Sequence, residues 1–278
     1  MIKSIFDCSK KEIKQILKTL DKKEKARFLN ERGRFGHNAL HKAPYDKFKL
    51  LVENGIDINN TDYDGGPIYY SDAKKLNLLI EHGVNVNKLK ISDENALFYI
   101  KSLERAKILI NAGCNVNQIN KIGYSPIFRV EPEILSFFLE NGANTQQINH
   151  DGKNVLFYST HKTIHLLIKY GADIHQINNK KENLLFYYTH LGDYKNLAYL
   201  IKQGVNILQK NKNNDYFLHK MKDKDIEILF EELNIPPIQL EEKPSQKTLL
   251  SYILSKLEQQ KLIDNFSGNT NNSHQKRL

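Results

Sequence analysis

The fold is indicated by the stretch at residues 96–117, which reads ALFYIKSLERAKILINAGCNVN. It opens with an apolar group at 96–98, continues to an apolar helix end and a glycine at Gly113, and closes with an asparagine at Asn117. A glycine after an apolar helix end is typical of a helix C-terminus that turns left-handed, a conformation that costs residues with a Cβ. The stretch therefore predicts a short helix, a longer helix and a turn.

This pattern recurs at a nearly fixed spacing. An apolar helix end precedes a glycine six times, at Gly55, Gly83, Gly113, Gly142, Gly171 and Gly204, with spacings of 28, 30, 29, 29 and 33 residues. The apolar helix start recurs with it, around Leu40, Ile68, Leu97, Ile127, Leu156, Leu185 and Leu218. A period between about 20 and 50 residues is the signature of a repeat protein.

Together these motifs resemble the ankyrin repeat over about residues 30–235. The resemblance implies an all-α solenoid of stacked helix-turn-helix units with shortened repeats of about 29 residues. We therefore divide the chain into a basic helical N-terminal cap at 1–32, about seven repeats at 33–235, a helical C-terminal cap at 236–264 and a disordered tail at 265–278.

The repeats depart from the ankyrin pattern in length. The apolar start and the glycine are 15 positions apart at Leu40 and Gly55, but 19 positions apart at Leu185 and Gly204. The shorter spacing predicts inner helices of little more than one turn, except after Leu185, where Gly192 can end a full helix. In addition, the motif histidine is replaced by an aromatic residue, which adds apolar area between repeats, at Tyr69, Phe98, Phe128, Phe157 and Phe186.

Both ends carry signals for capping helices. Ser9 with Glu12, and Asp21 with Glu24, are predicted capping boxes that open two basic helices. At the other end, Asn234 takes the place of the helix-ending glycine. An amphipathic helix is predicted from Thr248 to about residue 263.

Composition limits the function classes. The apolar runs are far shorter than the roughly 20 residues of a membrane span, no secretory signal is apparent, and two cysteines cannot build a disulfide framework. We expect a soluble cytoplasmic protein. The net charge of +9 is concentrated at the start, where residues 1–36 hold 11 Lys+Arg against 5 Asp+Glu, so nucleic-acid binding by the body of the chain is disfavoured.

No catalytic pattern is found, and we expect neither enzyme activity nor a cofactor or metal. His161 and His165 have the four-residue spacing of some zinc ligands. They lack a third ligand, however, and we interpret them as surface residues. Cys114 is interpreted as a small buried residue rather than a nucleophile.

A binding surface is predicted from exposed loop tips and from the position after the motif aromatic. Tyrosine and arginine are enriched at binding hot spots. An alternative is that the tyrosine rings only pack between adjacent inner helices. The candidate partner-binding residues are Phe35, Tyr63, Tyr70, Ile91, Tyr99, Ile122, Tyr124, Arg129, Tyr158 and Tyr187.

The shortened repeats resemble those of bacterial ankyrin proteins encoded beside contact-dependent or type VI secreted toxins, which are thought to be immunity proteins. The resemblance implies a non-catalytic, monomeric module that binds and neutralises a cognate toxin domain. Two alternatives stay open: a translocated effector that binds a host protein, and nucleic-acid association through the basic N-terminal cap.

Overall fold

The computed structural model describes residues 3–60, 62, 65–238 and 245–271. Within these residues the regular structure is entirely helical, with no strand, so the all-α prediction is confirmed. None of the described helices combines the length and apolar character that a membrane crossing requires. The chain divides into two compact units, residues 1–147 and 148–278, and each is described by itself.

The first unit begins with two capped helices, α1 (Lys10–Thr19) and α2 (Lys22–Leu29). Both predicted capping boxes are present: the side chains of Ser9 and Asp21 accept backbone N–H groups of their helices, and the glutamates at the third helical position bond back. Ile13 and Leu17 of α1 are buried, and α1 contacts α3 (Tyr45–Glu53). The apolar face of the basic segment therefore closes this end of the unit.

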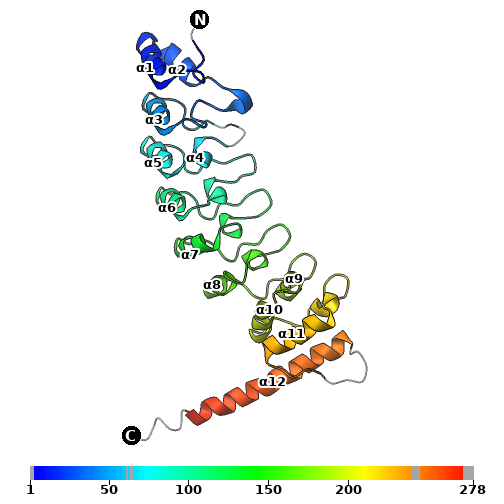
Figure 1. The fold of residues 1–278 in the computed structure, drawn as a ribbon. Coiled ribbons are helices and arrows are strands. Elements are labelled where there is room, and N and C mark those ends of the chain that lie inside the picture. Colours follow the sequence, from blue (N-terminus) through cyan, green and yellow to red (C-terminus); the bar gives the residue numbers. More distant parts are fainter. Residues whose placement is uncertain (1–2, 61, 63–64, 239–244, 272–278) are drawn as a thin grey trace, which may run out of the picture. The chain divides into compact units, whose positions relative to one another are not determined.

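A layer of longer helices follows. The helices α3, α5 (Ala73–Glu81), α6 (Leu103–Asn111) and α7 (Pro132–Glu140) contact one another in chain order (Figure 1). Each contributes at least one fully buried apolar side chain, namely Phe48, Leu76, Leu109 and Phe138. Burial of such side chains stabilises the layer by roughly 25 cal/mol per Å² of apolar surface.

The inner elements of this unit are single turns, as the spacing predicts. They are α4 (Pro67–Tyr70) and two 3-10 helices, η2 (Ala96–Tyr99) and η3 (Pro126–Phe128). The expected inner helix around Leu40 is only a turn, and a further 3-10 turn, η1 (Arg34–Gly36), lies in the preceding loop. The motif aromatics Tyr69, Phe98 and Phe128 are buried, which matches the expected exchange of a histidine for apolar area.

Asparagines hold successive turns together. The six helix-ending glycines have φ between 78° and 86°, as their position requires. In the first unit, the side chains of Asn59, Asn87 and Asn117 each accept the backbone N–H of the next turn, from Asn85, Asn115 and Asn144, at 2.7 to 2.8 Å. The asparagine-rich turns are therefore structural.

The second unit contains η4 (Val155–Tyr158), α8 (Ile164–Lys169), α9 (Leu184–Leu191), α10 (Tyr194–Lys202), η5 (Phe217–Lys220), α11 (Asp223–Leu233) and α12 (Gln246–Asn271). As predicted, α9 is a full helix: it ends at Gly192 with φ 68°, and Asp193 caps α10. The Tyr188 side chain of α9 is fully buried, whereas that of Phe186, which was expected to be buried, is only half-buried. A full helix carries Tyr188 inward, a position that a single turn does not reach.

The end of the second unit follows the expected capping. Asn234 adopts a left-handed conformation with φ 58° after α11. Leu249, Leu250 and Ile253 of α12 are buried. The helix continues to Asn271, beyond the predicted end near residue 263 and into the segment expected to be disordered. Residues 272–278 lie outside the described part of the chain.

Candidate binding surface on the first unit

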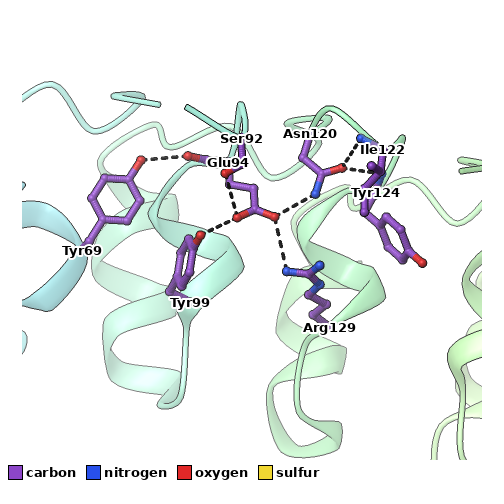
Figure 2. Close-up of polar contacts among 8 residues, drawn as sticks. All are labelled: Tyr69, Ser92, Glu94, Tyr99, Asn120, Ile122, Tyr124 and Arg129. Atoms are coloured by element: carbon purple, nitrogen blue, oxygen red, sulfur yellow. Dashed lines mark hydrogen bonds and ion pairs between the residues drawn. The ribbon is translucent and has the colours of Figure 1, made fainter. Parts of the chain in front are cut away.

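A buried carboxylate, that of Glu94, organises the loops beside the inner turns of the first unit. Glu94 is 5% exposed and is the acceptor for four side chains. Tyr99 and Ser92 donate to Oε2, the latter at 3.1 Å, while Asn120 donates to Oε1 at 2.8 Å and Arg129 pairs with Oε1 at 3.3 Å (Figure 2). Two neighbouring loops and two inner turns therefore meet at one carboxylate.

Backbone contacts fix the position of Glu94. The next residue, Asn95, accepts the N–H of Leu97 at the start of η2 and donates to the Asn115 carbonyl at 2.8 Å. The Glu94 carbonyl accepts the Lys90 N–H at 3.0 Å and lies 2.8 Å from the Tyr69 hydroxyl. Because buried polar groups must be paired to avoid a desolvation cost, these bonds make the loop rigid.

Asn120 links this cluster to the following loop. Its side-chain oxygen accepts the N–H groups of Ile122 at 3.1 Å and Tyr124 at 2.9 Å, while its amide donates to Glu94. The Tyr124 ring packs edge-on against Phe128 with centroids 5.1 Å apart. The loop that exposes Ile122 is therefore held from inside.

Hydrogen bonds and charges determine how the cluster titrates. Burial by itself would raise the pKa of Glu94, but hydrogen bonds from Tyr99, Asn120 and Ser92, together with Arg129, lower that pKa below its ordinary value. Burial and the nearby carboxylate raise the pKa of Tyr99 to about 12. At neutral pH the carboxylate is charged and the phenol is neutral, so the hydrogen bond between them is charge-assisted.

Two cations lie over the aromatic rings of this cluster. The Lys90 ammonium is 4.0 Å from the centroid of the Tyr99 ring and 4.8 Å from that of Tyr69. The Arg129 guanidinium is 5.5 Å from the centroid of the Tyr124 ring, and its side chain is 46% exposed. These contacts orient the cations beside exposed apolar residues.

Three predicted loop-tip residues are exposed apolar side chains: Ile91 is 87% exposed, Phe35 is 62% exposed and Ile122 is 49% exposed. Ile91 and Ile122 lie in the two loops that meet at Glu94, and Figure 2 shows Ile122 beside Asn120. Phe35 lies in η1, where its ring contacts His37. Residues 90–94 and 120–124, together with Arg129, carry three cationic side chains against Asp93 and the buried Glu94, a small cationic excess. Exposed apolar residues on such a frame are suited to contact with another protein.

Apart from Phe35, which lies in η1, the predicted site residues that the structure describes fall into three groups. Tyr99, Ile122, Tyr124 and Arg129 lie in the Glu94 cluster, and Ile91 belongs to the same loop. Tyr70 instead packs edge-on against His41 at 4.9 Å, and Tyr63 lies outside the described residues. Tyr158 and Tyr187 belong to the second unit, where Asn149 donates to the Tyr158 hydroxyl at 2.8 Å and Tyr187 packs against Phe157 and Tyr188.

Tyr99 fits both the binding interpretation and the packing interpretation of the tyrosines. Its ring packs edge-on against Tyr69 of the preceding inner turn with centroids 5.7 Å apart, which is the packing alternative. Its hydroxyl also holds Glu94, and through Glu94 the two loops. Tyr99 is therefore a residue that positions the surface.

Sequence reasoning missed Glu94 and Asn120. The loop register places Glu94 at a tip, where exposure is expected, but its side chain is turned inward. The signal that could have found it is Lys90, which stands where the loops at Asn120, Asn149, Asn178 and Asn211 have asparagine. A lysine cannot accept the two loop N–H groups that those asparagines accept.

Cys114 has the surroundings of a packing residue. It is 5% exposed, and burial raises the pKa of its thiol to about 12. At neutral pH the group is a thiol, and the nucleophilic form of cysteine is the thiolate. The exposed His165 packs its ring edge-on against Tyr199, with centroids 4.4 Å apart.

No protein-family model matches this chain, and no curated protein gives a significant match.

Proposed function

We propose that the chain is a non-catalytic protein-binding module of the ankyrin-repeat type. The observation that carries the proposal is a rigid, cationic loop frame that exposes two isoleucines, Ile91 and Ile122, at 87% and 49%. A monomeric protein does not gain stability from isoleucines in water, whereas binding of a partner would remove them from it. The repeated turns, with their asparagine bonds, support the ankyrin assignment.

The partner that we propose is a protein surface with apolar pockets and acidic groups. Ile91 and Ile122 would enter the pockets, and Arg129 and the exposed Lys121 would pair with the acidic groups. Charge complementarity of this kind raises association rates and selects among partners. The cationic frame is poorly suited to a strongly basic protein face.

The biological role that we propose is that of a cytoplasmic immunity protein, which binds and neutralises a cognate bacterial toxin domain. The support is the resemblance of the shortened repeats to those of ankyrin proteins encoded beside secreted toxins. Neutralisation needs no chemistry from the inhibitor, since occlusion of the toxin's active site is sufficient.

The test uses the protein encoded beside this chain in its native genome. Expression of that neighbour alone should arrest bacterial growth, and co-expression with the full chain should restore growth. The double variant Ile91→Asp/Ile122→Asp should lose protection and weaken binding in titration calorimetry by at least about 100-fold, because two buried contacts of hot-spot size are removed.

The matched control is Ile177→Asp, which places the same charge on an isoleucine that is 44% exposed in the second unit. This variant should protect as well as the unsubstituted chain. All variants are compared by circular dichroism and thermal unfolding. A neighbour that is harmless alone would overturn the immunity role, and equal binding by the double variant and the control would overturn the surface.

A further inference from the structure

We propose that His37, His41 and Asp62 form a binding site for a divalent transition-metal ion of the zinc class. Each of the three residues offers one ligand atom, and these atoms lie within 4.8 Å of one another. His37 and Asp62 lie in two successive loops of the first unit, and His41 lies in the inner turn around Leu40. The proposal is independent of the proposed function, because none of the three belongs to the Glu94 cluster.

The carboxylate of Asp62 is already oriented. Its Oδ1 accepts the Gly66 N–H at 2.9 Å, and its Oδ2 lies 3.1 Å from His37 Nδ1. The Asp62 side chain is fully buried and that of His37 is 15% exposed. Hydrogen bonds that orient a ligand from behind are a general feature of protein metal sites.

Backbone hydrogen bonds hold the segments that carry the two histidines. The His37 carbonyl accepts the Gly33 N–H at 2.9 Å, and the His41 N–H bonds to the Asn38 carbonyl at 3.1 Å. Their rings are stacked, with centroids 3.8 Å apart and planes inclined by 18°. Both rings therefore lie together beside the Asp62 carboxylate.

The ligand set matches zinc chemistry. Zinc binds imidazole nitrogen and carboxylate oxygen at about 2.0 to 2.2 Å, so neighbouring ligand atoms of a tetrahedral site are about 3.3 Å apart. His37 and Asp62 are at this separation already. The lone pair of each nitrogen lies in its ring plane, so one of the stacked rings must turn about its side-chain torsions to direct both nitrogens at one ion.

Three protein ligands leave one coordination position for water or for a group from a partner. An ion there would join the loop that carries Phe35 to the next loop, which contains Asp62. Metal that binds only the folded chain stabilises it by mass action. The ion would therefore cross-link these two loops near the start of the predicted repeats.

The test is titration of the full-length, tag-free chain with Zn²⁺ alone. Calorimetry should give one equivalent, and Co²⁺ should give the visible absorption of a four-coordinate site. Asp62→Asn keeps the acceptor for Gly66 but removes the anionic ligand. It should weaken Zn²⁺ binding by at least about tenfold, the smallest effect expected even for a second-sphere change, and His37→Gln and His41→Gln should do the same.

The matched control is His165→Gln, which removes an exposed histidine of the second unit and should leave the stoichiometry and affinity unchanged. Circular dichroism before titration identifies any variant that does not fold, and Asp62→Asn, the least disruptive, then decides. The absence of Zn²⁺ binding by the unsubstituted chain, or equal affinity of Asp62→Asn and the control, would overturn the site.

Discussion

Nearly the same six residues occur in both units and have different surroundings. Residues 94–99 read ENALFY and residues 182–187 read ENLLFY. In both, the asparagine accepts a backbone N–H at the helix start. In the first unit the Glu94 carboxylate reaches the following loop at Asn120, whereas the half-buried Glu182 bonds to Asn178 of its own loop, at 2.9 Å.

The two loops also differ at the residue four positions before the glutamate. Asn178 accepts two N–H groups of its loop and also donates to Glu182. Lys90, at the equivalent position, cannot accept those groups, and its ammonium lies over Tyr99 and Tyr69 instead. Glu94 then takes its hydrogen bonds from Ser92, the inner turns and the next loop. The loop that departs from the repeated asparagine hydrogen bonds is therefore the loop that carries Glu94 and Ile91 of the candidate surface.

The largest effect on stability is expected from Glu94→Ala. It leaves the buried amide of Asn120 and the hydroxyl of Tyr99 without their acceptor, so the free energy of unfolding should fall by about 2 to 3 kcal/mol. Glu182→Ala removes one half-buried acceptor and should cost less than about 1 kcal/mol. Urea denaturation measures the free energy of unfolding of both variants, and equal losses would contradict the expected difference.

A smaller difference is expected between the two tyrosines. Tyr99→Phe removes a hydrogen bond to a charged acceptor and should lower the free energy of unfolding by about 1.5 to 2 kcal/mol. The Tyr187 ring is held by contacts with Phe157 and Tyr188, which Tyr187→Phe preserves, so its cost should stay below about 0.5 kcal/mol. A larger loss from Tyr187→Phe, in the same urea experiment, would show that the two motifs are equivalent.

Acid should reduce the contribution of Glu94 to the free energy of unfolding. Its folded-state pKa is lowered from the ordinary value of 4.5, so its contribution is complete above that value and is lost as the pH falls through the folded-state value. Glu94→Gln lacks this titration. The difference in unfolding free energy between the unsubstituted chain and Glu94→Gln should narrow from pH 6 to pH 3, and a constant difference would contradict the charged network.

A small effect on stability is also expected from Arg129→Ala. The arginine side chain is 46% exposed, and without it Glu94 keeps its hydrogen bonds from Tyr99, Asn120 and Ser92, so the loss should stay near the roughly 1 kcal/mol of a half-exposed ion pair. The variant should therefore unfold nearly as the unsubstituted chain does, but should bind the proposed partner more weakly and with less dependence on salt. Stability measured by urea and affinity measured by calorimetry separate these two roles of Arg129, and a large loss of stability would assign it to the core.

Local features of the fold could be predicted from the sequence. The capping boxes at Ser9 and Asp21, the left-handed glycines, the single-turn inner elements and the full helix before Gly192 were all predicted and are present. Each depends on residues within one or two helical turns of one another. Phe186 was misjudged because a full helix presents Tyr188 to the core in its place.

The candidate surface depended on contacts between residues distant in sequence. The repeat register of the sequence indicated that Ile91 and Ile122 lie at loop tips, because each closely follows the turn residue of its loop, Lys90 or Asn120. The sequence alone did not indicate that Glu94 turns inward, because its acceptor role requires Asn120, 26 residues away.

Local conformational preferences and apolar spacing were therefore enough to predict the helical elements, their shortened inner turns and their capping residues. Which polar side chains meet, as Glu94 and Arg129 do, or His37 and Asp62, became clear from the folded structure. A buried charge is stable only where partners surround it, and those partners are brought together by the packing of successive turns and loops.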